Sequence, residues 1–190
     1  MTAATTHLSI DELTARQGVV DESPAEVGTV EMIVRRPDLA EREELDEGEL
    51  VVGAGLVGDD YLTRGSRETP DGAPHPEAQL NLMSSRSIDL VAGGDRDRWK
   101  LAGDQFFVDF DLSTDNAPTG TRIAIGAAVI EVAAKPHRGC AKFTRRFGVD
   151  ASRWVNSDPR RRFRGVNAIV VVGGVVRPGD AVRRLGPGAI

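Results

Sequence analysis

The sequence predicts a mainly β protein, either a barrel or a sandwich, with a few short helices. Segments of strand length with alternating apolar residues recur along the chain, and glycine- and proline-rich turns separate them. The helical patterns between them are short and few. With 190 residues, of which 40% are hydrophobic and 28% charged, the chain can bury a substantial core in one domain.

The N-terminal part is predicted to form a short helix over residues 8–18 that packs on the main body. The residues that predict it form a capping box, a hydrophobic staple and a glycine stop: Ser9 with Glu12, Leu8 with Leu13, and Gly18. The expected organisation is therefore an N-terminal helical appendage, one main domain and a C-terminal tail, over residues 1–27, 28–186 and 187–190.

Most of the main domain is predicted to be strands. In the clearest one, residues 103–113, four apolar side chains (Phe106, Val108, Phe110 and Leu112) face one side, and Phe107, Asp109 and Asp111 face the other. Short helices are expected over "SSRSIDLV" and over "CAKFTRRF", each ended by glycine. The further predicted strands lie within residues 28–36, 49–60, 78–83, 121–134 (with a glycine break), 166–172 and 181–185.

Three motifs are interpreted as structural. "GAGLVG", residues 53–58, matches a dinucleotide fingerprint but no helix follows it, so a bent, glycine-containing strand is expected. The three histidines lack the spacing of a metal site, and "DFDLSTDN" lacks the glycine and distal glutamate of a calcium loop. The proline- and glycine-rich segment 61–77 is a long loop of the kind that is usually functional or disordered.

The charge of the chain is unevenly distributed. The formal net charge is −5, which argues against a nucleic-acid binder, yet residues 37–60 are acidic and residues 135–164 are basic. A local basic patch suits a small anion or an anionic cofactor. The sequence shows no signal peptide and no apolar run long enough for a membrane span, so a cytoplasmic protein is expected.

Cys140, the only cysteine, lies within the basic stretch "AAKPHRGCAKFTRRFG". It cannot form an intramolecular disulfide. Cationic neighbours and a helix N-terminus favour a thiolate, which indicates a reactive group. Phe143 on the same predicted helix face instead indicates that Cys140 fills the core. The residues alone leave both interpretations open.

The order of several segments resembles the MOSC domain, the C-terminal module of eukaryotic molybdenum-cofactor sulfurases, and its small stand-alone bacterial members. The resemblance covers residues 28–186, and its most specific parts are "DLSTDNAPTGTRIAIG" and the cysteine after "KPHRG". Around them lie "GLVGD", "QLNLMSSRSIDLV" and "RGVNAIVVVGGVVRPGDAV". The resemblance implies a β-barrel fold.

The resemblance also implies a function and a site. Cys140 is expected to carry sulfur as a persulfide in sulfur transfer, or to ligate molybdenum in a cofactor-dependent reductase. The "RRRFR" arginines, residues 160–164, are plausible contacts for the phosphate of the molybdenum cofactor, molybdopterin. The other residues implied to bind the cofactor are Arg138, Lys142, Arg145, Arg146, Ser113, Asn116, Asp59 and Asn81.

Departures from the family pattern limit which properties of the family are expected of this chain. The aminotransferase-like domain of the sulfurases has no counterpart in this chain, so pyridoxal phosphate is not expected to bind. Expected partners are a sulfur-donor protein and a cofactor-accepting protein, with neither nucleic acid nor membrane. The alternatives are a non-enzymatic module that binds the cofactor or a partner protein, and a barrel with an unreactive Cys140. Whether the chain is an enzyme, and its oligomeric state, stay open.

Overall fold

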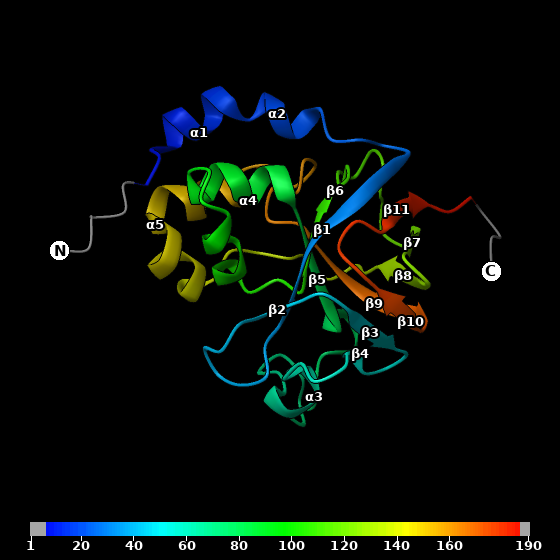
Figure 1. The fold of residues 1–190 in the computed structure, drawn as a ribbon. Coiled ribbons are helices and arrows are strands. Elements are labelled where there is room, and N and C mark those ends of the chain that lie inside the picture. Colours follow the sequence, from blue (N-terminus) through cyan, green and yellow to red (C-terminus); the bar gives the residue numbers. More distant parts are fainter. Residues whose placement is uncertain (1–6, 187–190) are drawn as a thin grey trace.

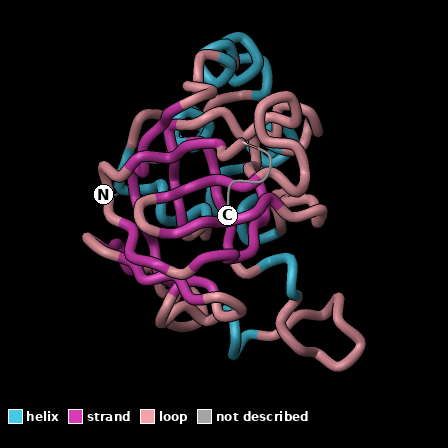
Figure 2. The backbone as a smooth tube through the Cα atoms, turned by 90° about the vertical axis from the view of Figure 1, so that its right-hand side faces the viewer, coloured by secondary structure: helices cyan, strands magenta, loops and turns pink. Residues whose placement is uncertain are grey.

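A closed seven-stranded barrel forms the body of the computed structural model, which describes residues 7–186 (Figures 1 and 2). The strand order is β11-β7-β8-β9-β5-β6-β1, and pairing of β1 with β11 closes the barrel. The prediction of a mainly β barrel is confirmed. The barrel strands are β1 (Val27–Arg35), β5 (Leu80–Ser84), β6 (Phe106–Asp109), β7 (Arg122–Ile125), β8 (Ala128–Val132), β9 (Val166–Val172) and β11 (Ala181–Arg184).

Alternation along the barrel strands separates two cores. Phe106 and Val108 of β6 belong to the apolar cluster inside the barrel, whereas Phe107 between them packs with the helices outside. Phe110 and Leu112 join the inner cluster, as the alternating pattern predicts. Successive side chains of a barrel strand point alternately into and out of the barrel. Both faces of β6 are apolar, because the inner face lines the barrel core and helices cover the outer face.

The helices gather on one side of the barrel (Figure 1). There α1 (Ile10–Arg16), α2 (Gly18–Asp21), α4 (Ser85–Ala92) and α5 (Ala141–Val155) cover the outer core with a 3-10 helix, Arg96–Ala102. Two short turns of helix lie in the long loop: α3 (Tyr61–Arg64) and a 3-10 helix, Pro76–Ala78. Across residues 7–186, none of these helices has the length and apolar character needed to cross a bilayer.

The N-terminal helix begins as the sequence predicts. Ser9 caps α1, and its backbone N–H donates to Glu12 Oε2 at 2.8 Å, which completes the capping box. Leu13 is fully buried, with Leu8 packed against the same cluster. The predicted stop at Gly18 is wrong, because Gly18 starts α2 and Val20 of α2 adds a buried contact. The predicted tail, residues 187–190, lies outside the described residues.

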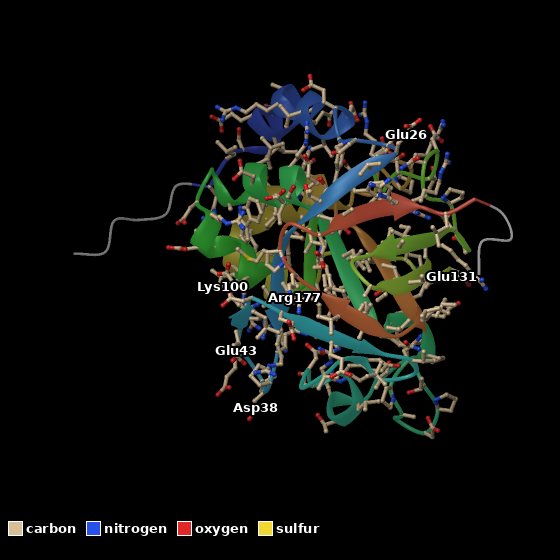
Figure 3. All side chains as sticks on the ribbon, turned by 45° about the vertical axis from the view of Figure 1, so that its right-hand side comes forward. Glu26, Asp38, Glu43, Lys100, Glu131 and Arg177 are labelled. Atoms are coloured by element: carbon tan, nitrogen blue, oxygen red, sulfur yellow. The ribbon has the colours of Figure 1, made fainter. Side chains whose placement is uncertain are left out.

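A small second sheet contains β3 (Gly48–Val51), β4 (Gly55–Leu56) and β10 (Gly174–Val176). The bent strand predicted within residues 49–60 is confirmed, because the chain turns after β3 and "GAGLVG" contains β4 instead of opening a helix. Two strands, β10 and the edge strand β2 (Glu43–Leu45), were not predicted from the sequence. The edge strand β2 pairs with the end of β1. It was hidden in the acidic segment, whose side chains Asp38 and Glu43 lie at the periphery of the molecule (Figure 3).

Candidate functional site

Cys140 is exposed at the N-terminus of α5. It is the N-cap residue, with an extended backbone (φ −106°, ψ 175°), and its carbonyl accepts a hydrogen bond from the Thr144 N–H at 3.0 Å. Phe143 and Phe147 of the same helix are buried. Because the helix starts only after Cys140, the thiol does not share the apolar face of these phenylalanines. Cys140 is therefore accessible and does not fill the core.

A bend in α5 helps to hold the loop that precedes Cys140. Gly148 has φ 90° and ψ 167° within α5, and past this bend the Oγ1 of Thr144 donates to the Oγ of Ser152 at 2.9 Å. Asn156 at the end of α5 then accepts the backbone N–H of Gly139 at 3.0 Å. Gly139, the residue before Cys140, is thus held by the C-terminal end of α5, the helix that Cys140 caps at its N-terminus.

The same loop is anchored from the barrel side. The side-chain amide of Asn167 in β9 donates to the carbonyl of Lys135 at 3.0 Å. Two residues on, His137 places its Nδ1 3.4 Å from Asp104 Oδ1, without hydrogen-bond geometry. These contacts determine where the backbone runs between β8 and α5, and so where the thiol is presented.

A buried ion pair lies beneath this loop. Arg164 places its Nη1 2.7 Å from both oxygens of Asp104, and donates through Nη2 to the carbonyl of Ala102 at 3.2 Å. The two side chains are 5% and 0% exposed. The guanidinium also lies over the ring of Phe143, 4.9 Å from its centroid. This pair therefore connects the barrel, the outer core and α5.

Burial, followed by the charges of Arg164 and Arg36, holds the pKa of His137 well below its ordinary value of 6.5. Asp104 does not reverse this effect, since its charge is already paired with Arg164. His137 is therefore neutral near pH 7 and contributes a neutral imidazole to the site.

The low pKa of His137 predicts a loss of stability in mild acid. In the unfolded chain the imidazole binds a proton below about pH 6.5, before the folded protein can. Its contribution is complete above that pH and is lost as the pH falls towards the folded pKa. The free energy of unfolding of the wild type should decrease from about pH 7 to about pH 5. We expect a smaller decrease in His137→Gln, which lacks the imidazole. Urea titrations at several pH values measure this, and equal drops would contradict it.

A basic cavity of about 640 Å³ opens beside the cysteine loop; we call it the first cavity. Its charged lining is mostly cationic. Arg138 makes no hydrogen bond or ion pair with any described residue, and Arg162 donates only to carbonyls, those of Leu112 and Ala117. The residues that carry its chemistry are Lys135, His137, Arg138, Gly139, Asp158, Arg162 and Arg164.

Buried polar atoms without partners also lie around the first cavity. Arg164 is 4% exposed, and its Nε has no hydrogen-bond partner among residues 7–186. The Nδ1 of His137 also lacks one. Buried polar groups are nearly always hydrogen-bonded, so two such atoms beside a cavity indicate water or a polar ligand there.

A second cavity of about 430 Å³ adjoins the first, and Asp158 and Arg162 line both. Ser84 lines it as the N-cap residue of α4, and its hydroxyl makes no capping hydrogen bond. The hydroxyls of Ser84 and Ser23, which are 4% and 8% exposed as residues, have no partner among the described residues. Since a helix N-terminus favours negative charge, these groups suit an anionic ligand with hydrogen-bonding oxygens.

Arginines and aspartates in pairs form the outer part of the second cavity. Arg161 pairs with Asp21 at 2.9 Å, and Arg160 pairs with Asp115 at 3.2 Å. Both arginines come from the basic run "RRRFR", which the sequence associates with an anion. Asp158 caps the turn that begins this run, because its Oδ1 accepts the backbone N–H groups of Arg160 and Arg161.

The residues implied by the family resemblance do not all converge on one cavity. Arg138 lines the first cavity and Ser113 the second. A third, smaller cavity of about 230 Å³ is lined by Lys142, Arg145 and Arg146 with Leu39 and Ala40. The basic residues after Cys140 therefore lie on a different surface from the two adjoining cavities.

The remaining three predicted site residues form structural contacts. Asn116 is 7% exposed and donates to the carbonyls of Ala25 and Asp111, which closes its loop. Asp59 is fully buried in an ion pair with Arg36 at 2.7 Å. Asn81 accepts from the same arginine at 3.2 Å. Neither Asp59 nor Asn81 lines any of the three cavities.

Sequence reasoning did not select several residues that shape the site. Ser23, Ser84 and Asp104 are far from Cys140 in the chain and carry no spacing signal. Ser84 precedes the predicted helix over "SSRSIDLV" as its first serine, which is a residue type typical of helix N-caps, and this was the one available signal. Asn156 follows a predicted helix, but its contact with Gly139 depends on the bend in α5, which sequence periodicity does not show.

Comparisons with known proteins agree with the barrel. The model of the MOSC domain matches residues 70–183. Among curated proteins, no match to the chain is found. Similar solved structures include the YUAD protein from Bacillus subtilis, with TM-score 0.61 and 16% identity over 82% of this chain and 94% of that one. YiiM from Escherichia coli has TM-score 0.54 and 18% identity over 85% and 72%. YiiM from Geobacillus stearothermophilus has a TM-score of 0.59 and 12% identity over 85% of this chain and 77% of that one.

At these identities the solved structures establish the fold alone. That fold is a closed barrel with helices on one side, and a cysteine-bearing loop leads from β8 into α5. The family follows from the sequence match, which covers more than half of the 190 residues. The chain belongs to the MOSC domain family, which is associated with molybdenum cofactor sulfurase-type proteins.

Proposed function

We propose that this protein is a sulfur carrier of molybdenum-cofactor metabolism, and that Cys140 holds the sulfur as a persulfide. The observation that carries the proposal is the exposed position of Cys140 at the start of α5, directly after two residues that line the first cavity. A persulfide carrier needs a thiol that both a donor and an acceptor can reach. A thiol sealed in the core could not serve.

Cationic side chains flank Cys140 in the chain, and the chemistry of a sulfur carrier uses the thiolate. The thiolate is the nucleophile, and cationic groups and helix N-termini stabilise it. Arg138, Lys142 and Arg145 lie within five positions of Cys140 in the chain, are exposed, and make no ion pair with the described residues. The backbone N–H groups of the first turn of α5 add a partial positive charge.

We assign the molybdenum cofactor to the second cavity, which Arg162 shares with the first. The cofactor's phosphate suits Ser23 and Ser84 with the N-terminus of α4, because both buried hydroxyls lack protein partners among the described residues. Arg162, between the cavities, would neutralise further negative charge. When bound, the cofactor supplies a metal centre that accepts a sulfur ligand. Ser113 lines the second cavity and would add a hydroxyl contact to the cofactor, whereas Arg138 lines the first cavity.

Sulfur uptake by the purified protein tests the proposal. We expect the intact mass to increase by one sulfur atom after incubation with 2-hydroxyethyl persulfide, and the increase to disappear on treatment with a reductant. Because Cys140 is the only cysteine, the whole-protein mass assigns the site. An unchanged mass under these conditions would leave the chain as a non-enzymatic module that binds the cofactor or a partner.

Molybdenum ligation by Cys140 is the second candidate function, favoured by the exposed position of Cys140 directly after Arg138 and Gly139, which line the first cavity. In this alternative the chain acts as a small reductase. Protein purified from cofactor-replete cells would then contain molybdenum in near-stoichiometric amount, and Cys140→Ser would lose it. We place either activity in the cytoplasm, where a lone thiol stays reduced. Its partners there would be a sulfur donor and a cofactor-accepting protein.

A further inference from the structure

We propose that the first cavity is a binding site for a small anionic sulfur donor of the thiosulfate class, from which Cys140 takes its sulfur. This inference rests on the proposed function and adds the chemical class of the donor. It assigns the first cavity to the donor's oxyanion, whereas the cofactor's phosphate is assigned to the second.

Uncompensated positive charge in the first cavity is the first argument. Arg138 has no partner among the described residues, and Arg162 has only carbonyl acceptors. Arg164 is neutralised by Asp104, and Asp158 is the one carboxylate in the lining. The cavity therefore retains net positive charge on a chain whose formal net charge is −5.

Buried atoms without hydrogen-bond partners are the second argument. The Nε of Arg164 and the Nδ1 of His137 are buried, unpaired, and belong to residues that line the cavity. The Nε–H of Arg164 can donate a hydrogen bond to an oxygen of a sulfonate-like group, whereas the Nδ1 of His137 lies 3.4 Å from the carboxylate of Asp104. A purely apolar donor would leave the Nε–H of Arg164 unsatisfied.

One cationic side chain of the cavity lining, Lys135, already forms an ion pair. Glu68, from the long loop after α3, pairs with Lys135, whose side chain is 19% exposed. The hydrogen bond and charge of Lys135 lower the pKa of Glu68, so it is ionised at neutral pH. Glu68 does not itself line the cavity, but it already pairs with Lys135, so a soluble oxyanion would compete with Glu68 for that lysine.

The transfer balances without any further reactant. The thiol proton of Cys140 goes to water, and the thiolate attacks the outer sulfur of thiosulfate. The sulfur–sulfur bond of thiosulfate breaks as a new sulfur–sulfur bond forms on Cys140. Sulfite leaves with the electron pair of the broken bond, and the cationic groups of the cavity hold its oxygens. The products are one cysteine persulfide and one sulfite.

Donor choice provides the test. Wild-type protein is given thiosulfate or 2-hydroxyethyl persulfide, which lacks a sulfonate-like oxyanion. Sulfur gain is followed by intact mass, and the thiosulfate reaction also by the sulfite that it releases. We expect uptake from both donors. Arg138→Gln should lower the rate constant with thiosulfate by about tenfold more than the rate constant with the persulfide, because a charge-assisted hydrogen bond to the oxyanion is lost only with thiosulfate. Arg183→Gln, at an exposed arginine of β11 outside the three cavities, is the control of equal charge.

Two outcomes separate this inference from the proposed function. If Cys140 takes sulfur from the persulfide but not from thiosulfate, the anionic-donor inference is wrong and the carrier function stands. If neither donor loads Cys140, the carrier function itself fails. Equal rates for Arg138→Gln and Arg183→Gln with thiosulfate would also overturn the assignment of the first cavity.

Discussion

Cys140→Ser is expected to abolish sulfur uptake while leaving the fold intact. Serine replaces the sulfur nucleophile with a hydroxyl that stays protonated near neutral pH, so no persulfide can form. The side chain is exposed and its thiol caps no helix N–H, so the free energy of unfolding should change by less than about 0.5 kcal/mol. Intact mass spectrometry measures the uptake, and urea denaturation measures the stability.

Cys140→Ala separates nucleophilicity from polarity at the same position. Both variants should fail to gain sulfur, because neither side chain offers a thiolate. If either variant still gains a sulfur atom that a reductant removes, a group other than Cys140 accepts it. That result would contradict the assignment, whatever the stability of the variant.

Asp104→Ala is expected to destabilise the protein by about 3–5 kcal/mol, the usual cost of leaving one charge of a buried ion pair unpaired. Asp104 is fully buried, and Arg164 approaches both of its oxygens at 2.7 Å. Removing the carboxylate leaves the guanidinium with the Ala102 carbonyl as its one backbone acceptor. Chemical denaturation of the wild type and the variant measures the difference.

An exposed ion pair provides the matched control. Asp115 pairs with Arg160 at 3.2 Å, and both side chains are 75% exposed. Asp115→Ala should therefore cost no more than about 1 kcal/mol. If the two alanine variants lose similar stability, the Asp104–Arg164 pair does not hold the barrel to α5 as described.

Local sequence patterns predicted most of the barrel. Alternation in residues 103–113 assigned Phe106 and Phe107 to opposite faces, and the structure places them in different cores. The strand at Glu43–Leu45 was missed because two of its three residues are glutamates with no buried face. The helix after Cys140 was predicted to end at Gly148, and the backbone there is non-helical (φ 90°, ψ 167°), but a second helical segment follows directly and runs to Val155. A glycine indicates a break in a helix but does not indicate whether the chain becomes helical again after it.

The candidate site was less predictable, because it depends on contacts between distant segments. The basic loop around Cys140 was visible in the sequence, and so was the run of arginines at residues 160–164. The sequence did not show that the basic residues belong to different cavities. Arg162 and Arg164 line the first cavity, whereas Lys142 and Arg145 line the third. Ser84 faces the second cavity only because β5 delivers the start of α4 there. Such positions follow from barrel closure and not from local spacing.

The most direct test of the carrier function is to locate the sulfur after loading. Wild-type protein is incubated with 2-hydroxyethyl persulfide under native conditions, trapped with an alkylating reagent and digested for peptide mass spectrometry. The account predicts an alkylated persulfide on the peptide that contains Cys140, formed at a rate that exceeds the rate for the urea-unfolded chain. An unmodified Cys140, or equal rates for folded and unfolded protein, would contradict it.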